Sequence, residues 1–147
     1  QVVERFGVSV EVLTPDTVDE RVEVIKRRDD YDKNPDDYAA TWDKENRKLR
    51  NKIQKARKSL GSITVDSKIL EHCAQICIDL GSDGLRGELT LVRTARALAA
   101  FNDKERVDLG HIKQIAPMAL SHRLRRDPLD DAGSGTRVER SVQKIIG

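Results

Sequence analysis

The sequence predicts a mainly α fold, a helical bundle, and two observations carry this prediction. Charged residues make up 35% of the 147 residues and aromatic residues only 3%, while Leu, Ile, Val and Ala supply the apolar content. This composition is typical of a bundle with heavily solvated helix faces rather than of a sheet sandwich. From residue 69 onward, apolar residues also recur at intervals of three and four, the spacing of amphipathic helices.

The first predicted element is nevertheless a strand. Phe6, Val8, Val10 and Val12 alternate with small or polar residues, which is the period of a half-buried strand. The rest of the sequence offers this strand no partner, so it indicates the end of a sheet whose other strands are missing. We therefore expect these residues to be part of a longer protein, and the lack of an initiator methionine favours the same expectation.

A helical connector is predicted over residues 14–62. It begins with a helix over residues 18–28. Residues 29–37 (DDYDKNPDD) are acidic and contain a proline, so we expect a loop there. A long polar helix follows over residues 38–60, with a narrow apolar stripe among many charges. Such a stripe is typical of a helix that projects from a core or packs along its edge.

Residues 63–147 are predicted to form the bundle itself, in four helices. Asp66 caps the first helix, whose buried stripe comprises Ile69, Leu70, Cys73, Ile76, Cys77 and Leu80. The second helix runs from about Arg86 to Ala100, with one side formed by Leu89, Val92, Ala95, Arg96 and Ala99. Asp108 caps the third helix, and residues 137–146 form a short last one.

Arg86 is the residue of greatest functional interest. It lies in residues 84–91 (GLRGELTL), where a loop opens into a helix. A positive side chain in the first turn opposes the helix macrodipole and costs a few tenths to about 1 kcal/mol. The free backbone N–H groups of that turn form a natural anion site, so a bound phosphate would explain the arginine. Local sequence alone favours instead an exposed arginine paired with Asp83 or Glu88.

The sequence does not indicate a metal site or a complete catalytic site. Cys73 and Cys77 lie four residues apart beside His72, but a zinc site needs further ligands at a recognisable spacing. Buried cysteines that act as small apolar residues are the expectation, and their placement on one helix is poor geometry for a disulfide. The sequence contains no catalytic triad pattern and no G-x-x-x-x-G-K-[ST] phosphate loop.

Charge and hydropathy exclude further classes. The formal net charge of +2 is too small to indicate nucleic-acid or membrane binding. The basic residues 122–126 (HRLRR) lack the interleaved aromatics of a nucleic-acid binder, and a solvated helix end is expected. No apolar run approaches the ~20 residues of a membrane-spanning helix, and the sequence begins without a signal-peptide pattern. We expect an intracellular protein without membrane insertion.

Taken together, four segments resemble AAA+ ATPases and, within that class, the ATPase (I) subunit family of magnesium chelatase. They are residues 4–8 (ERFGV), 22–29 (VEVIKRRD), 85–100 (LRGELTLVRTARALAA) and 122–130 (HRLRRDPLD). They follow the expected order and are spread over most of the chain, and the last two are the most specific. The resemblance implies that residues 1–13 end an ATPase core, 14–62 connect, and 63–147 form the helical lid.

The family's roles carry over to single positions. Arg5 matches the arginine finger, which reaches the nucleotide site of the neighbouring subunit. Arg86 matches the sensor-2 arginine, which touches the phosphates of its own subunit. Glu4 matches an acidic interface residue that is usually aspartate in the family, and residues 125–127 (RRD) match a motif without an assigned role. The phosphate loop and the Mg²⁺-binding strand would lie upstream, so these residues alone should not hydrolyse ATP.

The resemblance also implies cofactors and partners. It implies a homo-oligomeric ring that uses ATP and Mg²⁺ and acts with a second AAA+ subunit (D) and a porphyrin-binding subunit (H). The complex would insert Mg²⁺ into protoporphyrin IX for chlorophyll or bacteriochlorophyll synthesis, in the cytoplasm or the plastid stroma, without a nucleic-acid partner. Three alternatives stay open: another AAA+ remodelling ATPase of the MoxR or helicase kind, a non-enzymatic helical interaction module, and the second AAA+ subunit of the chelatase.

Overall fold

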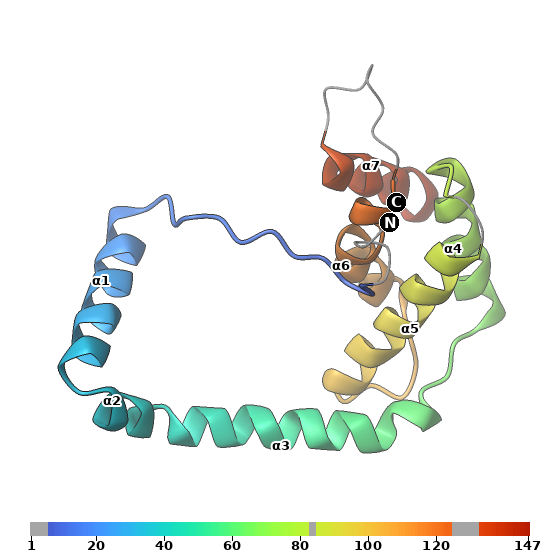
Figure 1. Ribbon diagram of the computed structural model, residues 1–147. Helices are drawn as coiled ribbons and strands as arrows, with labels where there is room; N and C mark the ends of the chain where they lie inside the picture. The colour runs from blue at the N-terminus through green and yellow to red at the C-terminus, as the bar shows by residue number, and fades with distance from the viewer. Residues whose placement is uncertain (1–5, 83–84, 125–132) are drawn as a thin grey trace. The chain divides into compact units, whose positions relative to one another are not determined.

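The computed structural model describes residues 6–82, 85–124 and 133–147, and the regular structure of these residues is helical (Figure 1). The α-helices are α1 (Val18–Lys33), α2 (Pro35–Thr41), α3 (Asp43–Ser59), α4 (Ser67–Asp79), α5 (Arg86–Phe101), α6 (Leu109–Leu120) and α7 (Ser134–Ile146). Two 3-10 turns, η2 (Leu60–Ser62) and η3 (Ser121–Arg123), follow α3 and α6. The prediction of a mainly α fold is confirmed.

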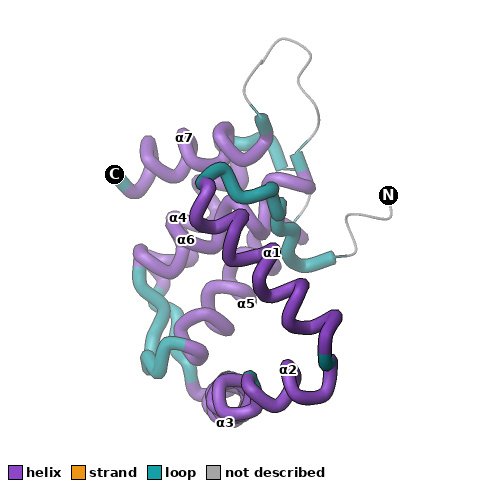
Figure 2. Tube along the Cα trace, turned by 90° about the vertical axis from the view of Figure 1, so that its left-hand side faces the viewer, coloured by secondary structure: helices purple, strands orange, loops and turns teal. Residues whose placement is uncertain are grey.

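The strand predicted over residues 6–12 is not formed. In the part of the chain that the structure describes, Figure 2 shows helices joined by loops, and residues 6–16 carry no regular structure. A strand needs a neighbouring strand to pair with its backbone N–H and C=O groups, and none of the described residues forms one beside this segment. Its apolar side chains are therefore exposed, 62% for Phe6 and 89% for Val12. Apolar residues do alternate in this segment, but the described residues contain no sheet in which it could be a strand.

The chain divides into two compact units, residues 11–54 and residues 1–10 with 55–147. In the first, α1 and α2 pack against each other and bury none of their residues. Asn34 separates the two helices, and its side chain caps α2 by accepting a hydrogen bond from the backbone N–H of Asp37. Pro35 occupies the first turn of α2, a position where its missing N–H costs nothing.

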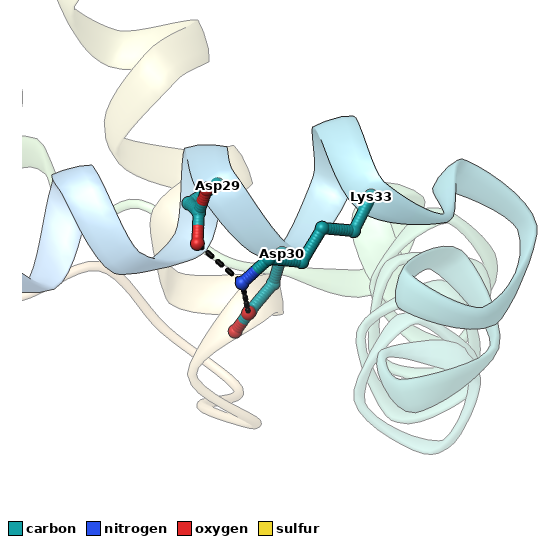
Figure 3. Close-up of polar contacts among 3 residues, drawn as sticks. All are labelled: Asp29, Asp30 and Lys33. Carbon is teal, nitrogen blue, oxygen red and sulfur yellow. Dashed lines mark hydrogen bonds and ion pairs between the residues drawn. The ribbon is translucent and has the colours of Figure 1, made fainter.

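The loop predicted over residues 29–37 is wrong, because α1 continues through the acidic run as far as Lys33. Ion pairs between successive turns stabilise this extension. Lys33 pairs with Asp29 and, at 3.8 Å, with Asp30, as Figure 3 shows, and Arg28 pairs with Asp32 at 2.8 Å. Opposite charges spaced three or four residues apart are neighbours on the helix surface and stabilise the helix. The acidic residues thus extend the helix instead of ending it.

The single helix predicted over residues 38–60 is interrupted. α2 ends at Thr41, and α3 begins at Asp43 after Trp42. The indole ring of Trp42 lies 4.9 Å from the guanidinium of Arg27 and 6.4 Å from the ring of Tyr38. These contacts hold the break against α1, within the unit formed by residues 11–54.

The second unit contains the hydrophobic core, which α4, α5, α6 and α7 build together. The largest fully buried side chains include Ile76, Leu91, Ile112, Leu120 and Val138. On α5 the predicted side is correct at Ala95 and Ala99, which are fully buried. It is wrong at Leu89, which is 51% exposed, whereas Leu91 is fully buried.

An ion pair and a helix cap stabilise the loop between α5 and α6. Asp103 adopts a positive φ of 55° where α5 ends, and Lys55 pairs with its carboxylate at 2.8 Å. Asp108 then caps α6 as predicted. Its carboxylate accepts a hydrogen bond from the backbone N–H of His111 at 3.0 Å, and the His111 ring accepts one from the Asp108 N–H, which completes a capping box.

Candidate functional site

Arg86 is the first residue of α5, and its side chain is exposed. The preceding residue, Leu85, gives the helix no side-chain cap. Leu85 therefore leaves the backbone N–H groups of the first turn without a cap of its own, and these groups lie at the positive end of the helix dipole. No hydrogen bond or ion pair of the Arg86 guanidinium is found among the described residues, and Asp83 lies outside them. The pairing with Glu88 that local sequence favoured is not formed.

Gly87 explains why the chain can place Arg86 there. A Cβ atom at Gly87 would lie 2.7 Å from Ser82 Oγ, 3.4 Å from Cys77 Sγ and 3.6 Å from a methyl group of Leu120. A side chain at this position would force Ser82 Oγ to move, and it would touch Cys77 of α4 and Leu120 of α6 at about van der Waals distance. The glycine therefore lets the first turn of α5, which carries Arg86, lie close to both helices and to Ser82.

The two cysteines next to this turn belong to the buried core and do not form a reactive site. Cys73 and Cys77 are buried, free thiols on α4. Burial raises the pKa of Cys73 to about 11 and that of Cys77 to about 12, and the nearby charge of Glu88 adds to both shifts. Such thiols stay protonated and unreactive near neutral pH. The described residues contain no cluster of three or more potential metal ligands, and the expectation of buried, apolar cysteines is confirmed.

The sequence did not anticipate a second feature, at the end of α6. The backbone carbonyl of Phe6 accepts hydrogen bonds from His122 Nε2 at 3.0 Å and from Arg123 Nη2 at 2.9 Å. Arg123 also donates from Nε to the carbonyl of Ala119 at 3.1 Å. One guanidinium therefore joins the last turn of α6 to the N-terminal segment. The prediction of a merely solvated basic helix end is wrong for these two side chains, which are half-buried.

A third hydrogen bond holds the same segment. The Ser9 N–H donates to the carbonyl of Met118 at 2.9 Å. Residues 6–9 are thus fixed to the last turn of α6 and to η3 by three hydrogen bonds. The predicted finger Arg5, the predicted interface residue Glu4 and the RRD motif at 125–127 lie outside the described residues.

The two features lie at one end of the second unit. Gly87 lies against Leu120, the last residue of α6, so the turn that carries Arg86 is next to the turn that binds Phe6. Segments far apart in the sequence thereby meet at the junction of α5 and α6. The sequence contains little indication of the contact with Phe6. It shows only a predicted strand without a partner and two hydrogen-bond donors, His122 and Arg123, directly after a helix.

Comparison with protein families identifies the helical unit. The family model of the AAA lid domain matches residues 70–145, which span α4 to α7. The chain belongs to the AAA lid domain family. The expected helical lid is therefore confirmed at the level of the family.

Similar proteins extend this lid assignment. The magnesium-chelatase 38 kDa subunits of Cereibacter sphaeroides and Rhodobacter capsulatus are each 53% identical to the chain over 146 residues, or 99% of it. The chloroplastic magnesium-chelatase subunit ChlI-1 of Arabidopsis thaliana is 37% identical over the same share. The resemblance to this subunit family is confirmed. The chain spans 44%, 42% and 34% of the lengths of these relatives, so it corresponds to less than half of each.

A solved structure agrees on the fold. A candidate ATPase from Cytophaga hutchinsonii matches 97% of the chain, and 47% of its own length, with a TM-score of 0.66 at 19% identity. At this identity the likeness concerns the fold alone. Within the described ranges, no helix combines the length and the apolarity that crossing a bilayer requires.

Proposed function

We propose that the chain is the lid and finger-bearing region of the ATP-hydrolysing ring subunit of a magnesium chelatase. The observation that carries this proposal is the exposed guanidinium of Arg86 on a helix start without a side-chain cap, within an AAA lid domain. Such a turn fits a phosphate, because an arginine and free backbone N–H groups converge on the same anion. The similarity to named magnesium-chelatase subunits over 99% of the chain supports the reaction.

In this proposal the two arginines act on different nucleotide sites. Arg86 contacts the phosphates of ATP bound to its own subunit, and Arg5 enters the site of the neighbouring subunit, with Glu4 at that interface. A positive charge supplied in trans stabilises the charge that develops on the transferred phosphoryl group. Hydrolysis would then depend on a homo-oligomeric ring. The phosphate loop and the Mg²⁺ ligands would come from the core that precedes this region.

The region would then comprise three parts. Residues 1–13 end the ATPase core, residues 14–62 connect it, and residues 63–147 form the lid. Because Arg86 lies on the lid, nucleotide bound to the core would draw the lid toward it and convert binding energy into motion. That motion would act through a second AAA+ subunit and a porphyrin-binding subunit to insert Mg²⁺ into protoporphyrin IX, in the cytoplasm or plastid stroma.

The test is steady-state ATP hydrolysis by the full-length protein. Arg86→Ala and Arg5→Ala should each lower kcat by at least about 100-fold, given that an arginine finger contributes about 10³–10⁵. A mixture of the two variants should recover activity, because an intact finger then faces an intact nucleotide site in some pairs of subunits. Arg106→Ala is the control, since this arginine is exposed and lies in the loop before α6. Wild-type rates in both single variants would refute the assigned roles.

A further inference from the structure

His122 and Arg123 belong to the motif of residues 122–130, for which neither the sequence nor the proposed function supplies a chemical role. Their side chains converge on one acceptor, the carbonyl oxygen of Phe6. A carbonyl oxygen has two lone pairs, and here each accepts one donor from a neighbouring side chain. The position of this peptide group is therefore fixed in two directions.

The Phe6 side chain contributes little to this arrangement, because it is 62% exposed. The segment is instead held through its backbone, at Phe6 by two side chains and at Ser9 by the carbonyl of Met118. Backbone anchoring of this kind sets the path of a segment whatever its side chains are. In the sequence, Phe6 directly follows Arg5.

The donors are themselves held in place. Arg123 donates from Nε to the carbonyl of Ala119, four residues earlier, so its guanidinium is oriented by the last turn of α6. The planar guanidinium then presents Nη2 to Phe6. In His122 the proton must be on Nε2, because a carbonyl can only accept, and the buried Nδ1 has no partner among the residues described.

We propose that His122 and Arg123 are positioning residues for the arginine finger, which they hold by binding the backbone of the residue that follows Arg5. This inference rests on the proposed function, because it requires Arg5 to act in the neighbouring nucleotide site. His122 and Arg123 touch neither the nucleotide nor the reacting atoms. They act by binding the Phe6 backbone, at the start of the described part of the segment, to the end of α6 and to η3.

Loss of the anchor should affect the two nucleotide sites that a subunit serves differently. A subunit without the anchor should be a poor donor of the finger, while its own nucleotide site, with Arg86, stays intact. Misplacement of a catalytic group by about 1 Å can lower a rate by about 100-fold. In the full-length protein, Arg123→Ala should therefore lower kcat for ATP hydrolysis by about 10- to 100-fold, with the KM for ATP little changed.

Mixing experiments with full-length variants separate the donor defect from other defects. Arg123→Ala mixed with Arg86→Ala should recover ATP hydrolysis, because the Arg86→Ala subunit donates an intact finger to an intact site. Arg123→Ala mixed with Arg5→Ala should not recover, because neither subunit then supplies a working finger. The mixture of Arg5→Ala with Arg86→Ala provides the reference for full recovery, and Arg106→Ala is the matched arginine control.

A second pair of variants guards against a simple loss of folding. His122→Gln keeps a donor near the position of Nε2 and should retain most of the activity, whereas His122→Ala should show the same donor defect as Arg123→Ala. Thermal unfolding of each variant should match that of Arg106→Ala.

The possible outcomes are distinct. Recovery of Arg123→Ala by Arg5→Ala and not by Arg86→Ala would show a defect in the subunit's own site and overturn the inference. Recovery by neither, or wild-type activity of Arg123→Ala alone, would overturn it as well. If the reference mixture of Arg5→Ala and Arg86→Ala fails to recover, the proposed function itself fails, and the inference falls with it.

Discussion

The two leucines in the middle of α5 provide a sharp test of the core. Leu91 is fully buried, and Leu89, on the same helix two positions earlier, is 51% exposed. We expect Leu91→Ala to destabilise the second unit strongly and Leu89→Ala to have almost no effect. The pair is well matched, because the same atoms are removed from the same helix and only the surroundings differ.

The magnitude follows from the burial. Truncation of leucine to alanine removes apolar atoms worth about 0.8 kcal/mol per buried methylene group, and the cavity left behind adds to this loss. Fully buried leucines accordingly cost about 2–5 kcal/mol. The free energy of unfolding of a domain is only about 5–15 kcal/mol, so Leu91→Ala removes a large fraction of it. Leu89→Ala should change it by no more than about 0.5 kcal/mol.

The chain offers a probe that reports on this unit alone. Its two cysteines, Cys73 and Cys77, both lie in the core formed by α4 to α7 and are buried. Short pulses of a thiol reagent along a urea series, read by mass spectrometry, therefore measure the unfolding of this core without a contribution from α1 and α2. With a urea dependence of about 1–3 kcal/mol per M and a loss of about 2–5 kcal/mol, Leu91→Ala should lower the midpoint by about 0.7 M or more.

The comparison can fail in a clear way. Equal midpoints for Leu91→Ala and the wild type would show that Leu91 is not packed in the core. An equal loss in both variants, or a larger loss for Leu89→Ala, would show that α5 presents the other side to the core. The described packing of α5 against α6 would then be wrong.

Three further predictions concern local interactions. Asp108→Ala should lower the free energy of unfolding by about 0.5–2 kcal/mol through loss of the α6 cap, whereas Asp108→Ser should retain most of it, as urea titrations would show. Because burial raises the pKa of Cys77 to about 12 from an ordinary 9.0, the folded state keeps a proton that the unfolded state releases. The stability of the wild type should therefore fall as the pH rises from 9 toward 12, by more than that of Cys77→Ala, which calorimetry can compare. The hydrogen bond from Lys144 lowers the pKa of Asp79, so Lys144→Ala should cost less than about 1 kcal/mol at pH 7. This cost should be complete above pH 3.8, the ordinary pKa of the group, and should vanish in unfolding measurements as the pH falls from there through the lowered pKa of folded Asp79.

Elements with strong local signals could be predicted from the sequence. The cap at Asp108 is local, because the side chain that makes it and the N–H group that it binds are three residues apart. The start of α5 at Arg86 and the burial of Cys73 and Cys77 likewise followed from composition and spacing. The packing contacts between these helices could not be predicted, because the sequence does not show which helices are neighbours.

The sequence-based predictions were wrong where distant or competing interactions determine the structure. Residues 29–37 looked like a loop because of their charge and proline, yet ion pairs within α1 stabilise the helix as far as Lys33. The choice between Leu89 and Leu91 depends on how α5 packs against α4 and α6, and the local sequence pattern does not specify this packing. The hydrogen bond from His122 to Phe6 joins residues 116 positions apart, and no local pattern predicts it.

The most direct test of the proposed function is a graft into a named relative. This chain can replace the corresponding region of the Cereibacter sphaeroides magnesium-chelatase 38 kDa subunit, to which it is 53% identical. The measurement is ATP-dependent formation of Mg-protoporphyrin IX in the presence of the partner subunits. We predict a rate within about tenfold of the unmodified subunit, a loss of about 1.4 kcal/mol at most, and abolition of the activity by Arg86→Ala in the graft. A folded graft that hydrolyses ATP but inserts no Mg²⁺ would contradict the chelatase assignment and favour another AAA+ machine.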